Sequence, residues 1–149
     1  MNVKDAYPLV VVGDPQEMRE WYCRHLGFSV GFEVDWVVFL ASPGPRPFGV
    51  CFMREGLEHQ LPQFRPRIAG DALVLTLEVD DAREALREVE ATGVAPEVSL
   101  RDEPWGQRHF MLRDPAGVWV DVVQSIDPDP DFLDAAARER LAALNDPTS

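Results

Sequence analysis

Basic residues, long apolar runs and cysteine motifs are rare or absent in this 149-residue chain, and each absence excludes a class of protein. Its 14 lysine and arginine residues face 26 aspartate and glutamate residues, for a net charge of −12. Nucleic-acid phosphates require basic surfaces, so we expect no nucleic-acid partner. No apolar run approaches the ~20 residues that span a bilayer, so we expect neither a membrane association nor a signal peptide. The two cysteines, Cys23 and Cys51, form no motif, which favours a reduced, cytoplasmic protein.

Motifs for covalent and phosphate chemistry are also missing. No serine or cysteine lies beside a recognisable base, and no glycine-rich loop could bind a phosphate. The excess of acidic residues would suit a cationic ligand, but solubility is the simpler explanation. The apolar content of 46% is ordinary for a folded domain, so the remaining information lies in the order of the residues.

The most informative stretch, Glu103–Gln124, predicts two strands joined by a tight turn. Side chains alternate over Arg108–Arg113 and again over Trp119–Val123, and Asp114–Gly117 has the Asp-Pro-x-Gly chemistry of a turn. Asp121 falls between a tryptophan and a valine on a face that should be half buried. Burying an unpaired carboxylate is costly, so Asp121 needs a partner or a ligand.

The beginning of the chain predicts a βαβββ unit. A strand is expected over Tyr7–Val12, and then a helix that Asp14 caps and Gly27 ends. The alternation of apolar residues predicts three further strands over Ser29–Glu33, Val37–Ala41 and Gly49–Arg54.

The same order of elements returns later in the chain. A strand is expected over Leu73–Val79, a helix from Asp81 to Gly93, a strand over Pro96–Leu100, and then the two strands described above. Asp81 follows Asp14 by 67 residues (81 − 14), and the apolar positions around both aspartates match at that spacing. The sequence therefore predicts an internal duplication.

The predicted fold class is α+β, with two tandem βαβββ modules plus a C-terminal helix. The expected boundaries are residues 1–54 for the first module, 55–71 for a linker, 72–126 for the second module and 127–149 for a helical extension. The extension carries an apolar stripe at helical spacing: Leu133, Ala137, Leu141 and Leu144. Such a stripe packs against its own sheet or a second subunit, and we expect a homodimer.

Three features together resemble the vicinal oxygen chelate superfamily. They are the two modules, the segment Asp14-Pro15…Trp21-Tyr22…Leu26-Gly27-Phe28, and the segment Trp105-Gly-Gln-Arg108…Asp114-Pro-x-Gly117. That superfamily includes glyoxalase I, extradiol dioxygenases, fosfomycin-modifying enzymes and the bleomycin- and mitomycin-binding resistance proteins. The resemblance covers roughly residues 5 to 125. It implies that the mixed sheets of the two modules curl into a cup and that a ligand or a metal lies inside this cup.

The resemblance also implies where a metal would be held. In the metal-binding members the ligands lie on the first and last strands of each module, and these positions fall on Tyr7, Val74 and Asp121, with a fourth in the region Cys51–Met53. A metal needs several converging donors, and Val74 has none. We therefore expect neither a metal nor another cofactor.

Candidate ligand-binding residues come from the strand alternation and from the aromatic residues near those strands. They are Tyr7, Trp36, Phe39, Phe52, Val74, Thr76, Glu78, Trp105, Arg108, Phe110, Trp119 and Asp121. As a group they suit a planar or hydrophobic ligand held by stacking and oriented by Asp121 and Glu78. For any single aromatic residue, core packing is the alternative. For Arg108 the alternative is a surface ion pair, and Asp121 would be structural if Arg108 or Arg113 paired with it.

Two functions remain open at this point. The first is a small-molecule-binding protein of the glyoxalase/bleomycin resistance type, which sequesters a hydrophobic or cationic aromatic compound without metal, as in antibiotic resistance. The alternative is a lyase, isomerase or dioxygenase of the same superfamily. Such an enzyme would be metal-dependent, with a site built from Asp121 and His59 or His109, or would use Asp121 or Glu78 as a general base.

Overall fold

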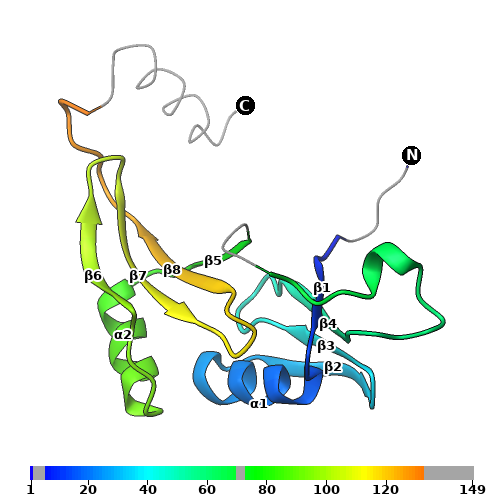
Figure 1. The fold of residues 1–149 in the computed structure, drawn as a ribbon. Helices are drawn as coiled ribbons and strands as arrows, with labels where there is room; N and C mark the ends of the chain where they lie inside the picture. The colour runs from blue at the N-terminus through cyan, green and yellow to red at the C-terminus, as the bar shows by residue number, and fades with distance from the viewer. Residues whose placement is uncertain (2–5, 70–72, 133–149) are drawn as a thin grey trace.

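The computed structural model describes residues 1, 6–69 and 73–132 and forms two four-stranded sheets, each with one helix (Figure 1). The first module consists of β1 (Leu9–Val12), α1 (Pro15–Leu26), β2 (Ser29–Val34), β3 (Val37–Ala41) and β4 (Gly49–Arg54). The second consists of β5 (Val74–Glu78), α2 (Ala82–Ala91), β6 (Val98–Glu103), β7 (Gln107–Arg113) and β8 (Trp119–Ser125). A short 3-10 helix, η1 (Pro62–Phe64), lies in the linker.

Both sheets have the same topology. Their strand orders are β1-β4-β3-β2 and β5-β8-β7-β6. In each module the first strand pairs in parallel with the last strand, and the other neighbouring pairs are antiparallel. The α+β class with two tandem βαβββ modules is therefore confirmed.

Both helices begin at the predicted aspartates. Asp14 Oδ1 accepts hydrogen bonds from the backbone N–H groups two and three residues later, at 2.9 and 3.2 Å. Asp81 Oδ1 does the same at 2.8 and 3.1 Å. The first helix ends at Gly27, whose φ of 68° is a conformation that glycine adopts without strain. The duplication seen in the sequence therefore includes its capping hydrogen bonds.

The two helices meet at equivalent positions. His25 Nδ1 of the first module lies 2.6 Å from Thr92 Oγ1 of the second, and these residues are 67 positions apart. This is the spacing that relates Asp14 to Asp81. The contact therefore joins the C-terminal ends of α1 and α2.

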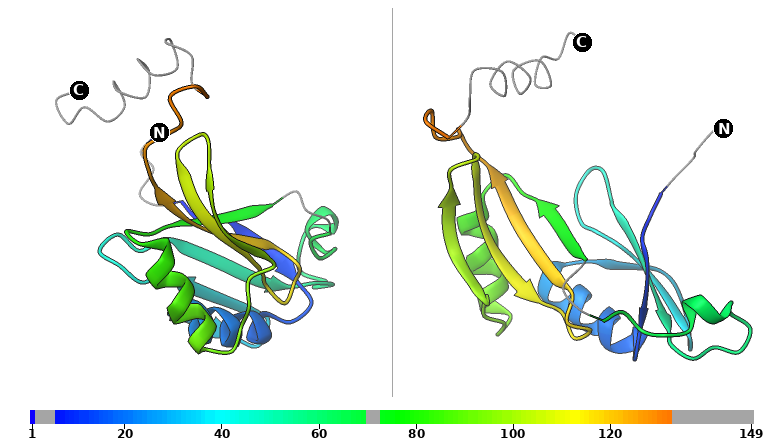
Figure 2. Two further views of the ribbon diagram at one scale, coloured as in Figure 1. Left: turned by 90° about the vertical axis from the view of Figure 1, so that its left-hand side faces the viewer. Right: turned by 45° about the horizontal axis from the view of Figure 1, so that its top comes forward.

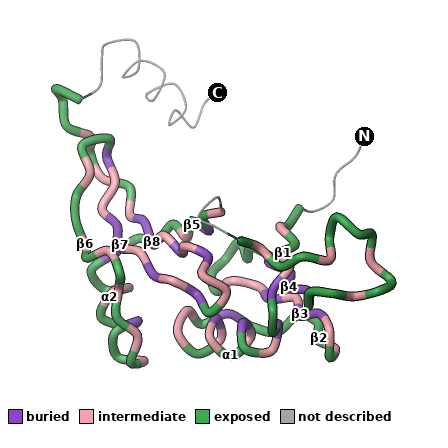
Figure 3. Tube along the Cα trace, in the orientation of Figure 1, coloured by how far each residue is buried: buried purple, intermediate pink, exposed green. Residues whose placement is uncertain are grey.

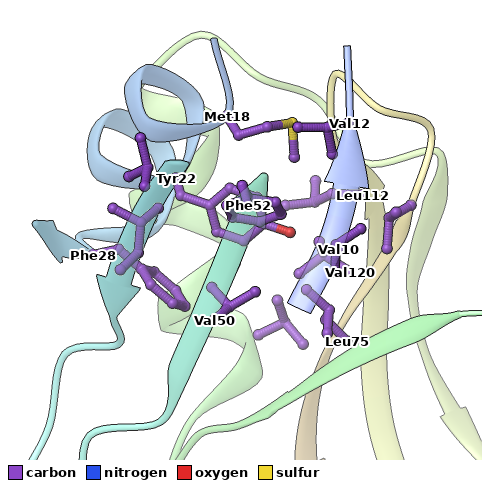
Figure 4. Packing of buried hydrophobic residues seen from close by; sticks show 14 of the residues in the cluster. Val10, Val12, Met18, Tyr22, Phe28, Val50, Phe52, Leu75, Leu112 and Val120 are labelled. Atoms are coloured by element: carbon purple, nitrogen blue, oxygen red, sulfur yellow. The ribbon is translucent and has the colours of Figure 1, made fainter. Parts of the chain in front are cut away.

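One hydrophobic core serves both modules (Figure 4). Its buried members in the first module are Val10, Val12, Met18, Tyr22, Phe28, Val38, Leu40, Val50 and Phe52. Those in the second are Leu75, Val89, Phe110, Leu112, Val118, Val120 and Val122. The fully buried Tyr22 ring packs on Phe28 and Phe52, with centroids 5.2 and 5.1 Å away. The face of each sheet that carries its helix is thus turned toward the other module.

The opposite face of each sheet, called the distal face below, is turned away from this core (Figure 2). The strand register places Leu9, Val11, Phe32, Val34, Val37, Phe39, Cys51 and Met53 on the first distal face. It places Val74, Thr76, Glu78, Arg101, Glu103, His109, Met111, Arg113, Trp119, Asp121 and Val123 on the second. Within one chain the two sheets do not close upon each other. Buried positions lie along the strands and inner helix faces, as the purple segments of Figure 3 show.

The boundaries differ from the sequence-based expectations at a few places. The first strand begins at Leu9 rather than Tyr7, and β6 extends to Glu103 rather than ending at Leu100. β6 is an edge strand that ends in three consecutive charged residues, Arg101–Glu103, which explains why this part of the strand resembles a loop in the sequence. The predicted C-terminal helix falls mainly outside the described residues. Among the helices that the structure describes, none is long and apolar enough to cross a membrane.

Candidate ligand-binding site

The β7–β8 hairpin organises the second distal face. In its turn, Asp114 Oδ1 accepts hydrogen bonds from the backbone N–H groups of Ala116 and Val118, both at 2.9 Å. This turn sets the register of the strands, which pairs Arg113 with Trp119, Met111 with Asp121, and His109 with Val123. Directly paired residues project from the same face of a sheet, so these six side chains share the distal face.

A chain of polar side chains crosses this face from β6 to β8. His109 Nδ1 lies 2.8 Å from Asp121 Oδ1, and His109 Nε2 lies 3.2 Å from Glu103 Oε1. The side chains of Glu103, His109 and Asp121 are only 10, 9 and 15% exposed. Arg101 pairs with Glu103 at the outer end of the chain. Burial raises the pKa of Glu103, but hydrogen bonds from Arg101 and His109 outweigh it and hold that pKa below its usual range.

The same geometry argues against a metal at Asp121. Both ring nitrogens of His109 already face carboxylate oxygens, so neither offers a free lone pair in this arrangement. Val74, at another position implied by the resemblance, is apolar, and Tyr7 packs edge-on against Phe39 with centroids 5.0 Å apart. Across the described part of the chain, no three His, Cys, Asp or Glu side chains form a group that could hold a metal. The residues present do not fit a metal site.

Trp119 lies beside Asp121 with one side of its indole already occupied. The Arg113 guanidinium carbon lies 3.6 Å from the centroid of the Trp119 ring, which is a cation–π contact. The Arg113 side chain also donates to Gly117 O at 2.6 Å and lies 3.6 Å from Glu97. The predicted aromatic wall is therefore present, but a ligand must stack on the other side of the indole or displace Arg113.

The first distal face is apolar and partly covered by the linker. Phe39 lies at its centre, and a Cβ atom on Gly49 would come within 2.6 Å of the Phe39 ring, so glycine is needed there to make room. Leu57 of the linker packs into the cluster that contains Met53. His59 of the linker lies edge-on to Trp36, with ring centroids 5.0 Å apart. This contact gives the His59 ring a packing role rather than a place beside Asp121.

Three of the candidate ligand residues point away from both distal faces, and their assignment to the site is wrong. Phe52 and Phe110 are 0% exposed in the shared core. Phe52 faces the core because β4 pairs it with Val10, whereas its neighbours on either side face the other way. Arg108 forms two hydrogen bonds with Asp102, at 2.6 and 2.7 Å, on the opposite side of the sheet from Asp121. The surface ion pair considered for Arg108 is therefore confirmed.

The other candidates are spread over three places. Val74, Thr76 and Glu78 lie on the edge strand β5, where register pairs Thr76 with Asp121 and Glu78 Oε1 accepts a hydrogen bond from Ser125 at 2.7 Å. Trp105 occupies the β6–β7 turn, is 44% exposed, and donates to its neighbour Gln107 at 2.6 Å. Tyr7, Trp36 and Phe39 belong to the first module. One chain thus gathers the β5 and β8 candidates on one face and leaves the other candidates apart from them.

A separate cleft of about 500 Å³ lies between the start of α1, the linker and the β7–β8 turn. Its lining includes the apolar residues Val12 and Met18 together with Arg67 and Pro115. None of the candidate ligand residues lines it, so its size does not bear on the distal faces.

The comparisons with known proteins agree with this architecture. The family model of the Glyoxalase/Bleomycin resistance protein/Dioxygenase superfamily matches residues 6–122, and no curated protein sequence matches the chain. A glyoxalase/bleomycin resistance protein/dioxygenase from Nocardioides has a similar structure, with a TM-score of 0.69 and 16% identity over 85% of this chain and 86% of that one.

Two solved structures with printed binding roles share the fold. TnmS3, an antibiotic binding protein from Streptomyces sp. CB03234, has a TM-score of 0.63 and 22% identity over 84% of this chain and 98% of that one. A bleomycin-binding protein complexed with bleomycin has a TM-score of 0.60 and 20% identity, covering 83% of this chain and 99% of that one. At such identities the likeness shows the fold alone. With the family model matching residues 6–122, the chain belongs to the glyoxalase/bleomycin resistance protein/dioxygenase superfamily.

Proposed function

We propose that this chain binds an aromatic small molecule on its distal faces and sequesters it without converting it. The observation that carries the proposal is that Trp119 and Asp121 lie two residues apart on β8 and project from the same face of the sheet. His109 engages Asp121 Oδ1. Among the described residues, the structure records no hydrogen bond to the second oxygen of that carboxylate, so it can accept one from a ligand.

The expected ligand carries an aromatic ring and a hydrogen-bond donor. Stacking on Trp119 would contribute about 0.5–1.5 kcal/mol beyond burial of the ring. A charge-assisted hydrogen bond to Asp121 would contribute about 1.5–3 kcal/mol. The antibiotic-binding and bleomycin-binding proteins of the same fold support a binding role. Among the described residues, no group of His, Cys, Asp and Glu side chains could hold a metal ion, so metal catalysis has no support from the donors.

Ligand binding should depend on the charge of Asp121 specifically. We expect Asp121→Asn to weaken binding of a donor-bearing planar drug about tenfold, as removal of one charge-assisted hydrogen bond implies, and Trp119→Ala to weaken it as well. Tryptophan fluorescence titrations over a panel of charged and uncharged planar drugs, with bleomycin included, would measure this.

The matched control is Asp102→Asn, which removes a carboxylate from the opposite face of the same sheet. It should leave the dissociation constant within about twofold, because an exposed ion pair on the far face contacts no ligand. Equal losses for both variants would show an effect of net charge alone. No response from the wild type to any drug of the panel would contradict the proposed ligand class.

We further propose that the functional unit is a homodimer. Both distal faces point away from the core within one chain, and Leu9 and Phe32 on the first are 50 and 55% exposed. A second copy that covers these apolar side chains would also enclose the ligand. Light scattering should give a mass near twice 16.8 kDa. A monomer at every concentration tested would contradict this expectation.

We also expect the purified protein to carry no stoichiometric transition metal. The reason is the donor set: Val74 cannot bind a metal, and His109 is engaged by carboxylates at both nitrogens. Elemental analysis measures this directly. About one metal ion per chain, lost on replacing Asp121 with alanine, would show that the donors rearrange to bind one.

A second candidate is a metal-free lyase or isomerase, and the contact between His109 and Asp121 favours it. A carboxylate beside an imidazole can take up a proton from a bound substrate and pass it on. Glu78 is the weaker candidate base, because it is exposed on the edge strand β5 and already accepts a hydrogen bond from Ser125. The two functions differ in whether the bound molecule returns to solution unchanged.

A further inference from the structure

The polar chain on the second distal face alternates in sign along its length. It runs from Arg101 through Glu103 and His109 to Asp121, with each member in hydrogen-bond or ion-pair contact with the next. Arg101 is 61% exposed at the outer end, whereas the other three side chains are at most 15% exposed. Because Glu103, His109 and Asp121 are nearly buried, each charge among them must face a neighbour that balances it or forms a hydrogen bond with it.

We propose that His109 is a positioning residue for the ligand site, a role that rests on the proposed function. As an imidazolium, His109 donates one hydrogen bond from Nε2 to Glu103 and a second from Nδ1 to Asp121 Oδ1. The other carboxylate oxygen of Asp121 remains available to the ligand. The ligand class that follows is an aromatic molecule with a neutral hydrogen-bond donor, such as a phenol or an amide, in preference to an aromatic cation.

Counting protons supports the charged form of His109. A neutral imidazole has one N–H and one lone pair, so one of its two carboxylate contacts would place a lone pair against a carboxylate oxygen. Distances of 2.8 and 3.2 Å to Asp121 and Glu103 are both hydrogen-bond distances, which two N–H donors satisfy. A hydrogen bond from His109 is also one of the interactions that hold the pKa of Glu103 below its usual range.

The charge balance selects the ligand class. The groups that face His109 are Arg101 and Glu103 from β6, Asp121 from β8 and, beyond Val123, Glu78 from β5. With His109 charged, Arg101, Glu103, His109 and Asp121 sum to zero and Glu78 adds −1, whereas the whole chain carries −12. A cationic ligand would meet a carboxylate that is already neutralised, whereas a neutral donor needs only the free oxygen in a fixed direction.

The charge state of His109 can be tested without any ligand. Nitrogen-15 NMR of histidine-labelled wild-type protein should show both ring nitrogens of His109 protonated, as its two carboxylate contacts require. Glu103→Gln and Asp121→Asn should each change the resonance of the His109 ring nitrogen that faces the substituted residue. A neutral His109 ring in the wild type, or a ring unaffected by both variants, would overturn the proposal.

The positioning role is tested with two probes that share one ring system, 2-naphthol and 2-methoxynaphthalene, in which a methyl group replaces the hydrogen of the hydroxyl donor. We expect the wild type to prefer the naphthol about tenfold, and His109→Phe to remove that preference. His109→Gln, which keeps one donor, should restore part of the preference. A merely structural role would lower both affinities together, and that result would overturn the proposal.

The failures of the two proposals can be told apart. If the probes bind but His109 is neutral, the positioning role is wrong and the proposed binding function stands. If His109 is charged but neither the probes nor the drug panel bind, the proposed function fails and the positioning role fails with it.

Discussion

Replacing Phe52 with alanine should destabilise the protein by about 3–5 kcal/mol, the range for truncating a fully buried phenylalanine. The side chain is 0% exposed and packs against Tyr22 in the core that both modules share. Truncation would remove its buried surface and leave a cavity between α1 and β4. Urea unfolding followed by circular dichroism would measure the loss as a lower midpoint at an unchanged slope.

The matched control for Phe52 is Phe64→Ala in the linker, where the side chain is 49% exposed. We expect that change to stay within about 1 kcal/mol, because little buried surface is lost. The pair of variants also tests the correction made above for Phe52. A Phe52→Ala protein of normal stability that no longer bound ligand would return this residue to the ligand site and contradict its place in the core.

Replacing Asp114 with alanine should destabilise the protein by about 3 kcal/mol, because three buried donors lose their acceptor at about 1 kcal/mol or more each. Asp114 is 4% exposed and accepts from the backbone N–H groups of Ala116 and Val118 through Oδ1. Its Oδ2 accepts from the Tyr22 hydroxyl at 3.0 Å. This last bond joins α1 of the first module to the β7–β8 turn of the second, so the variant should weaken the contact between the modules.

Asp114→Asn is the sharper variant, because its amide keeps an oxygen for the two backbone donors and can donate to Tyr22. We expect its stability at neutral pH to stay within about 1 kcal/mol of the wild type. Burial raises the pKa of Asp114, and the hydrogen bonds from Val118, Tyr22 and Ala116 offset that rise only in part.

The raised pKa of Asp114 fixes the direction of a pH effect. Because the folded pKa lies above the unfolded value of about 3.9, the stability associated with protonated Asp114 is present below that pH and is lost as the pH rises through the folded pKa. The wild type should therefore lose stability relative to Asp114→Asn from about pH 4 upward. A difference between the two proteins that stays constant over this range would contradict the assignment.

Much of the fold could be predicted because its signals are local. Asp14 and Asp81 cap helices through their own side chains, and alternation over β5, β7 and β8 depends only on neighbouring residues. The face that Phe52 occupies depends on the pairing of β4 with β1, two strands separated by the whole module. No local pattern carries that register, so a buried core residue was placed at the ligand site.

The candidate site was predictable only in part for a related reason. Asp121 and Trp119 could be identified from one strand, whereas the partner of Asp121 lies on another. Counting outward from the turn at Asp114 would have paired Met111 with Asp121 and so placed His109 within reach. Glu103 was missed because the strand before β7 was expected to end at Leu100, whereas β6 extends to Glu103 and pairs it with Gln107.

The most direct test of the central claim is native mass spectrometry of the protein with a planar aromatic drug that the fluorescence titration identifies as a ligand. We expect the wild type and Asp102→Asn to retain the drug, Asp121→Asn to bind it about tenfold more weakly, and the released drug to have an unchanged mass after prolonged incubation. Release of the drug with an altered mass would show that the protein is an enzyme. Equal retention by the Asp121→Asn variant would show that the ligand binds elsewhere than on the second distal face.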